Sequence, residues 1–155
     1  MNSKIKVDKF VIVAFLLCMV CNMTMQAKAY ESFKVSIYVR AYEVDKMKDI
    51  HWLDSTWNVI SQQLEVDKIY LETHRDLLVV EDATLEQAKK FFHDRGIETA
   101  GGITYTINEA NSFETFCYSN PEHRKMVQKI AEHTAKHFDE FILDDFFFTS
   151  CKSDI

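Results

Sequence analysis

The segment Lys68-Ile-Tyr-Leu-Glu-Thr-His74 carries the clearest structural information in the sequence. Its side chains divide into two alternating sets, Tyr70, Glu72 and His74 on one face and Ile69, Leu71 and Thr73 on the other. Successive side chains of a β-strand point to opposite faces of the sheet. The pattern therefore predicts a strand that buries one face and places ionisable groups on the other.

Further strands and helices are expected on both sides of this segment. The additional strands are predicted within 33–40, 97–107 and 140–148. Apolar residues at helical spacing indicate the first helix, namely Leu53, Trp57, Ile60 and Leu64. A capping box at Thr84–Gln87 predicts a second helix that stops at Gly96, and Pro121 opens a third with Asn120 as its N-cap. Four strands alternating with three helices predict a parallel sheet built from right-handed crossover units.

Two α/β architectures fit this alternation: an open three-layer sandwich, or the first half of a (β/α)8 TIM barrel. An open parallel sheet buries both faces and reads as nearly continuous apolar strands. Here one face of each of the first two strands is polar, and ionisable residues fall late in the strands, as at the mouth of a barrel. The barrel is the preferred interpretation.

A barrel of this kind typically needs about 250 residues, so the chain corresponds to about four of its β/α units. Half a barrel leaves two open strand edges and an uncovered inner face, and we expect it to be poorly stable alone. This suggests a truncated product, an incomplete gene model, or a half that self-associates with another copy through its open edges.

Residues 1–29 are predicted to be a secretory signal, and residues 30–155 the partial barrel domain. Three lysines precede a 12-residue apolar run, Phe10–Cys21, and Ala27-Lys28-Ala29 places small residues before a cut at Tyr30. The run is short for a membrane span, although an uncleaved anchor is the alternative. The expected location is periplasmic or extracellular, with membrane contact only through an uncleaved signal.

The composition is that of a single globular domain. Of 155 residues, 47% are hydrophobic and 27% charged, with only 3 Gly and 1 Pro. The formal net charge is −6, and loss of residues 1–29 would remove four Lys against one Asp. An acidic surface argues against nucleic acid as a partner and suits neutral or cationic ligands.

Asp144 and Asp145 are the leading catalytic candidates. Two adjacent acids after an apolar Phe-Ile-Leu run are costly to bury without partners or a chemical role. Neighbouring residues of a strand face opposite ways, so only one of the two would enter the site. The sequence does not decide which, and both could instead cap the following loop.

Glu72 is the third catalytic candidate, and His74 is a candidate ligand for substrate. Both are expected on one face of their strand, next to Arg75, where a carboxylate could act as general acid, base or sugar ligand. Surface charges around a turn are the alternative. His74 with Glu72, Asp144 and Asp145 could in principle hold a metal, but because no compact metal-binding pattern occurs, we expect neither a metal nor another cofactor.

Three further residues are expected to bind substrate. Tyr38 and Tyr105 could stack on the apolar faces of sugar rings. Arg40, on the polar side of the first strand, could bind ligand oxygens or pair with Glu72. Cys117 and Cys151 follow the third and fourth strands and could form a disulfide at one rim, with two buried free thiols as the alternative.

The exported start, the β/α alternation and the segment Phe138-Asp-Glu-Phe-Ile-Leu-Asp-Asp-Phe-Phe-Phe148 resemble secreted bacterial glycoside-hydrolase-type TIM-barrel proteins. The resemblance covers the N-terminal half of such a barrel. Similarity to α-galactosidase-like families implies that Asp144 or Asp145 is the nucleophile or a substrate-binding acid. The position at which chitinase-like enzymes carry a proton-donating Glu is Phe146, so that mechanism is not supported.

The resulting expectation is an N-terminal fragment of an exported glycoside hydrolase-like protein that acts on glycans through carboxylates. Glycoside hydrolysis generally needs two carboxylates, and only Glu72 offers a second one. The alternatives are a non-catalytic domain that binds carbohydrate and an inert truncated product.

Overall fold

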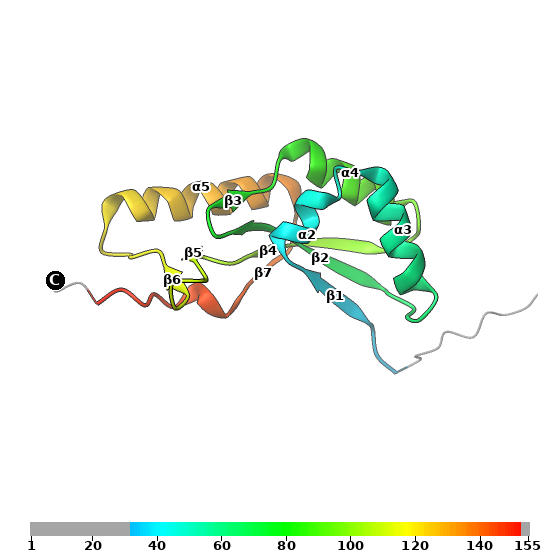
Figure 1. Ribbon diagram of the computed structural model, residues 1–155, viewed down its shortest axis with the longest axis horizontal. Coiled ribbons are helices and arrows are strands. Elements are labelled where there is room, and N and C mark those ends of the chain that lie inside the picture. Colours follow the sequence, from blue (N-terminus) through cyan, green and yellow to red (C-terminus); the bar gives the residue numbers. More distant parts are fainter. Residues whose placement is uncertain (1–31, 153–155) are drawn as a thin grey trace, which may run out of the picture.

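The computed structural model describes residues 32–152, and the predicted signal segment lies outside them (Figure 1). The strands are β1 (Ser36–Val39), β2 (Lys68–Arg75), β3 (Leu78–Val79), β4 (Glu98–Ile103), β5 (Thr106–Asn108), β6 (Glu114–Thr115) and β7 (Phe141–Leu143). The helices are α2 (Ala41–Lys46), α3 (Ile50–Ser61), α4 (Asp82–His93) and α5 (Pro121–His137), with a 3-10 turn at Asp145–Phe147. Within 32–152, no helix combines the length and the apolar character that a membrane crossing requires.

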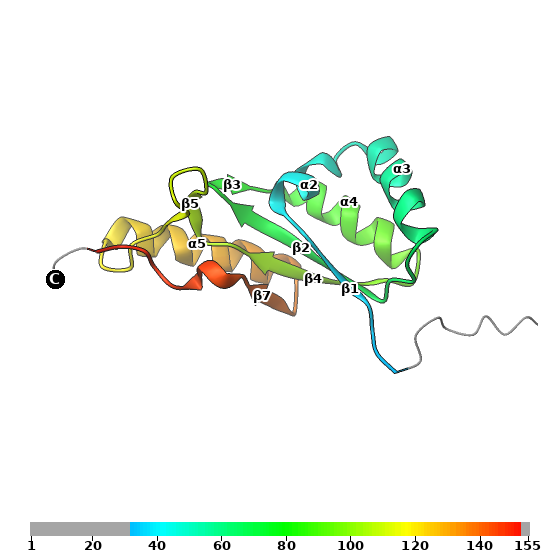
Figure 2. The ribbon, with the colours of Figure 1, turned by 60° about the horizontal axis from the view of Figure 1, so that its bottom comes forward.

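The main sheet is mixed but mostly parallel. Its path is β1-β2-β4-β7, each neighbouring pair is parallel, and β3 adds an antiparallel pairing to β2. The described helices lie on one side of this sheet, and no described helix covers the other (Figure 2). Strands in sequential order with helices on a single face differ from the open sandwich, where helices cover both faces.

The core lies between this sheet and its helices. Ile69 and Leu71 of β2 are buried against Leu85, Phe91 and Phe92 of α4. Gly101 of β4 lies against α5, because a Cβ there would come within 2.7 Å of the Thr134 side chain. The next residue, Gly102, faces the helix-free side. The two faces of the sheet are thus distinguished within one Gly-Gly pair.

Several predicted element boundaries need correction. α4 begins at Asp82, so Thr84 is a buried residue within the helix and not its N-cap. Gln87 does not reach back to form a capping box, because its amide donates to the carbonyl oxygens of Met47 and Lys48, at 2.6 and 3.2 Å. α5 was predicted correctly: it begins at Pro121, and the Asn120 side chain accepts from the Glu122 amide.

The third and fourth strands are shorter than predicted. β4 ends at Ile103, and the chain continues into a small β5–β6 hairpin that sequence patterns did not indicate. β7 spans only Phe141–Leu143 before the 3-10 turn. The helix α2 and the strand β3 were also not predicted. β7 forms an edge of the sheet, and each of its three side chains is partly exposed.

Candidate functional site

Polar side chains meet at the carboxyl ends of β2, β4 and β7, and Glu72 of β2 lies at their centre. Glu72 has no exposed surface. Its Oε2 accepts from the Ala41 amide at 2.6 Å and from Arg75 Nε at 2.8 Å. Its Oε1 accepts from the Tyr38 hydroxyl at 2.8 Å, from Arg75 Nη2 at 2.9 Å and from the Thr104 hydroxyl. A carboxylate with both oxygens bound inside the protein serves to position its neighbours, and in this structure substrate cannot reach it.

Arg75 links Glu72 to two other carboxylates. A β-bulge between Glu72 and His74 interrupts the alternation of β2. As a result Arg75 contacts Glu72, while His74 pairs in register with Ile103. Arg75 also binds Asp144 through Nη2, at 2.9 Å, and Glu109 through Nη1. The expectation that Glu72 and His74 share a face is wrong, because the bulge adds a residue between them.

Asp144 is the acid that joins this cluster. It follows β7, and its Oδ2 lies 2.9 Å from Arg75 Nη2 and 3.0 Å from Thr104 Oγ1. Its side chain is 31% exposed, so it remains accessible. Asp145 is exposed and starts the 3-10 turn. The structure thus distinguishes the two acids: Asp144 is held in the cluster, whereas Asp145 is exposed in the 3-10 turn.

Tyr38 completes the cluster from β1. Its hydroxyl donates to Glu72, and its ring lies over Gly102, where a Cβ would come within 2.7 Å of the ring. Burial, followed by the negative charge of Glu72, raises the pKa of Tyr38 well above its ordinary value. Burial alone would lower the pKa of Arg75, but hydrogen bonding to Glu72 and the charges around it raise that pKa overall. Tyr38 therefore stays a neutral donor and Arg75 a cation.

His74 lies behind the cluster instead of inside it. Its Nδ1 is 2.6 Å from the Thr104 carbonyl oxygen, and its ring lies against Phe116. The ring is almost completely buried, and burial lowers the pKa of His74. A neutral ring that donates from Nδ1 fits this environment. His74 is therefore buried and not at the surface.

The structure does not bring Arg40 or Tyr105 to the cluster. Arg40 precedes α2, is exposed, and pairs with Glu43 at 3.4 Å, so the expected pairing with Glu72 is wrong. Arg75 pairs with Glu72 instead, because Arg75 follows the bulge on the same strand, β2. Tyr105 is buried beside Phe116 and Ile130, and burial raises its pKa. A ring in this core cannot stack on a sugar.

Sequence reasoning missed Thr104 and Glu109. Glu109 lies in the β5–β6 loop, and its amide donates to Asp76 Oδ1 at 3.0 Å. Asp76 and Leu77 form the tight β2–β3 turn with positive φ values of 49° and 64°. This turn follows Arg75 directly and connects it to the loop of Glu109. Asp76, directly after Arg75, could have indicated a turn at this point, because Asp is common in turns. Nothing in the sequence distinguishes Glu109 from other acidic residues in loops.

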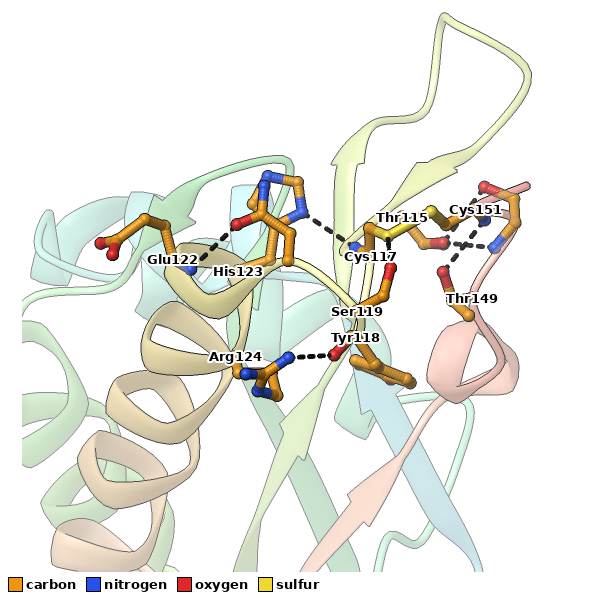
Figure 3. Close-up of a disulfide and its surroundings, with 11 residues drawn as sticks. Thr115, Cys117, Tyr118, Ser119, Glu122, His123, Arg124, Thr149 and Cys151 are labelled. Atoms are coloured by element: carbon orange, nitrogen blue, oxygen red, sulfur yellow. Dashed lines mark hydrogen bonds between the residues drawn. A yellow bond between two sulfur atoms is a disulfide. The ribbon is translucent and has the colours of Figure 1, made fainter. Parts of the chain in front are cut away.

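A disulfide joins Cys117 and Cys151 at this end of the molecule (Figure 3). The Cys117 amide donates to His123 Nδ1 of α5 at 2.9 Å. The Ser150 amide, beside the other cysteine, donates to Thr115 Oγ1 at 2.8 Å. The disulfide therefore ties the segment after Asp144 to the β6–α5 connection.

The arrangement can orient one accessible carboxylate. Arg75 Nη2 donates to Asp144 Oδ2 while Thr104 Oγ1 lies beside that oxygen, and Glu72 in turn fixes Arg75. Glu72 Oε1 and Asp144 Oδ2 each lie 2.9 Å from Arg75 Nη2, so they are no more than twice that distance apart. Because these oxygens are already bound by a cation and a hydroxyl, the cluster offers no ready set of metal ligands.

These features define an α/β protein with a carboxylate site at the carboxyl ends of parallel strands. The model of a family described as "Probable glycosyl hydrolase, catalytic domain" matches residues 22–155, and the chain belongs to this family. An uncharacterized protein of Saccharolobus solfataricus is 31% identical over 133 residues, covering 80% of this chain and 22% of that protein. The chain thus spans about a fifth of this relative. No solved structure matches.

Proposed function

We propose that this chain forms the first four β/α units of a (β/α)8 barrel in an exported glycoside hydrolase-like protein that acts on glycans. The sequential parallel strands, the helices on one face and the polar cluster at the carboxyl strand ends support this proposal. Residues 1–29 would direct export to the periplasm or the extracellular space. Membership of a glycosyl hydrolase family supports the class of reaction.

The observation that carries the proposal is the state of Asp144. It directly follows the fourth parallel strand and is partly exposed, and its Oδ2 accepts from Arg75 beside Thr104 Oγ1. The remaining oxygen, Oδ1, accepts no hydrogen bond from residues in the described range. A carboxylate oriented through one oxygen with the other free suits a nucleophile or a substrate-binding acid. Glu72 positions Arg75, and the acid partner would come from the second half of such a barrel.

The edge of the sheet supports completion by further β/α units. β7 is an edge strand, and Phe141, Ile142 and Leu143 are each about two-fifths exposed. An apolar edge strand invites pairing with another strand. In this proposal the partner strand belongs to the remainder of a longer polypeptide, and self-association of two copies is the alternative.

The test compares Asp144→Asn with Asp145→Asn in the longest natural polypeptide that contains this sequence. Release of nitrophenol from a panel of aryl α- and β-glycosides measures hydrolysis. We expect Asp144→Asn to lower kcat by at least about 10³-fold, and Asp145→Asn to leave it within a few-fold. Full activity of a folded Asp144→Asn protein would overturn the proposal. Circular dichroism checks the fold of each variant.

The second candidate function is carbohydrate binding without cleavage. The complete burial of Glu72 favours it, because this removes the only second acid that we predicted for catalysis. Titration calorimetry with oligosaccharides distinguishes the two functions. Saturable binding that yields no product and survives Asp144→Asn would favour the binding protein.

A further inference from the structure

A second polar cluster lies where α4 packs against α5, away from the carboxyl-end cluster. Asp82 and Glu86 are four residues apart on α4, and His133 and His137 are four residues apart on α5. Side chains at this spacing lie on the same face of a helix. The two pairs face each other, since His137 contacts both acids.

The hydrogen bonds of His133 leave one ring nitrogen available. Its Nε2 lies 2.9 Å from the carbonyl oxygen of Val80, which can only accept, so Nε2 carries the proton. In the neutral ring the lone pair is then on Nδ1. That atom lies 3.4 Å from Asp82 Oδ1.

His137 has the complementary arrangement. Its Nδ1 lies 2.8 Å from Glu86 Oε1, and its Nε2 lies 3.0 Å from Asp82 Oδ1. Two carboxylate oxygens flank this ring, so positive charge must lie between Nε2 and Asp82: either a proton on Nε2, or a metal ion in its place when Glu86 holds the ring proton on Nδ1. The His137 side chain is only 4% exposed, so little water can reach Nε2.

When Nε2 of His137 carries no proton, three electron-pair donors converge, and the neighbouring lysines bind other oxygens. Lys136 binds Oδ2 of Asp82, the oxygen that faces away from the histidines, and Lys89 binds Glu86 at 3.0 Å. Asp82 Oδ1, His133 Nδ1 and His137 Nε2 all lie within 4.8 Å of one another. Converging lone pairs repel unless a proton or a cation lies among them.

We propose that Asp82, His133 and His137 bind a divalent cation of the zinc type, with water as the fourth ligand. Tetrahedral Zn²⁺ with ligands at about 2.0–2.1 Å places them about 3.4 Å apart, close to the separations of 3.0 and 3.4 Å found here. Glu86 and the Val80 carbonyl fix the two rings, as the outer partners of zinc-bound histidines do. The ion would join the first turn of α4 to the last turns of α5 and would keep one coordination position open for water.

The first test is titration of the full, chelator-treated chain with ZnCl₂ by calorimetry. We expect one ion per chain. Asp82→Asn and His133→Gln should weaken binding by more than about 100-fold, and Glu86→Gln by about 10- to 100-fold, because it removes an outer partner only. His93→Gln is the matched control: His93 is exposed near the end of α4, and its loss should leave affinity unchanged.

The second test needs no substitution. Co²⁺ in place of Zn²⁺ should give the visible absorption of a four-coordinate His/carboxylate site, saturating at one equivalent. Absence of saturable Zn²⁺ binding, or absence of this absorption, would overturn the proposal. Binding that persists undiminished in Asp82→Asn and His133→Gln would also overturn it, since the ion would then be held elsewhere.

Discussion

Arg75 donates from Nη2 to Asp144 Oδ2 at 2.9 Å, joining two residues that lie 69 positions apart in the sequence. This contact connects the end of β2 to the end of β7. The same nitrogen contacts Glu72, so a buried acid orients the guanidinium that holds the accessible acid. The geometry of Asp144 therefore depends on residues that substrate need not touch.

Arg75→Met should destabilise the chain by about 3 to 5 kcal/mol, because it leaves the charge of Glu72 buried and unpaired. Urea unfolding followed by circular dichroism measures the change. Arg40→Met is the matched control, since Arg40 is exposed and its pairing with Glu43 is worth at most about 1 kcal/mol. Equal effects of the two substitutions would contradict the assigned role of Arg75. The double variant Glu72→Leu/Arg75→Met should be less destabilised than Arg75→Met alone.

Gly102→Ala should cost about 1 to 3 kcal/mol, because the added Cβ would meet the Tyr38 ring at 2.7 Å and displace its hydroxyl from Glu72. The free energy of unfolding measures this cost. Tyr38→Leu in the Gly102→Ala background should recover part of it by removing the clash. If the unfolding free-energy change of the double variant equals the sum of the two single changes, the close contact between Tyr38 and Gly102 is not the cause of the destabilisation.

The general arrangement of the sheet could be predicted because its signals are local. The alternating pattern of 68–74 defined β2, and Asn120-Pro121 defined the start of α5. The beginning of α4 was misplaced because Thr84 and Gln87 match a capping box in the sequence. The structure uses Thr84 in the core and Gln87 to bind the α2–α3 connection.

The candidate site was harder to predict because it depends on one irregularity. Strict alternation along β2 would place Glu72 and His74 on the same face of the sheet. Because of the bulge, Arg75 and not His74 lies beside Glu72. A bulge of this kind has no marker in this segment. The sequence analysis did not single out His133 and His137, and their partner Asp82 lies 55 positions before His137. Only the packing of α4 on α5 brings them together.

The free energy of unfolding should fall as the pH drops from about 7 toward 5. Burial lowers the pKa of His74 from the ordinary 6.5, so below that pH the unfolded chain binds a proton that the folded chain excludes. His74→Asn, which can still donate to the Thr104 carbonyl, should reduce this slope. Burial also lowers the pKa of His133, which contributes to the same pH dependence. In His74→Asn the dependence of the unfolding free energy on pH should therefore become weaker without disappearing.

Urea unfolding of the wild type and His74→Asn between pH 5 and 7.5 measures the difference in slope. Carboxylates with lowered pKa values, such as Asp82 at about 2, lose their contribution at lower pH and do not interfere. His51→Asn is the control, because His51 is exposed at the start of α3. Parallel curves for the wild type and His74→Asn would show that this ring does not set the pH dependence.

Reduction of the disulfide should destabilise the chain by about 3 to 4 kcal/mol, because Cys117 and Cys151 close a loop with a sequence separation of 34. Thermal unfolding with and without dithiothreitol measures the effect as a fall in Tm. Cys117→Ser/Cys151→Ser should unfold near the temperature of the reduced wild type and should not respond to dithiothreitol. This control distinguishes the effect of the Cys117–Cys151 bond from any effect of Cys18 and Cys21.

Since the loop closed by the disulfide contains α5 and β7, its constraint should also protect the connection of Asp144 to β4. Hydrogen exchange at the Asp144 amide, which donates to the Ile103 carbonyl at 2.9 Å, should therefore accelerate on reduction. If reduction leaves the exchange rate of the Asp144 amide unchanged, the disulfide does not protect this connection and affects only the global stability of the chain.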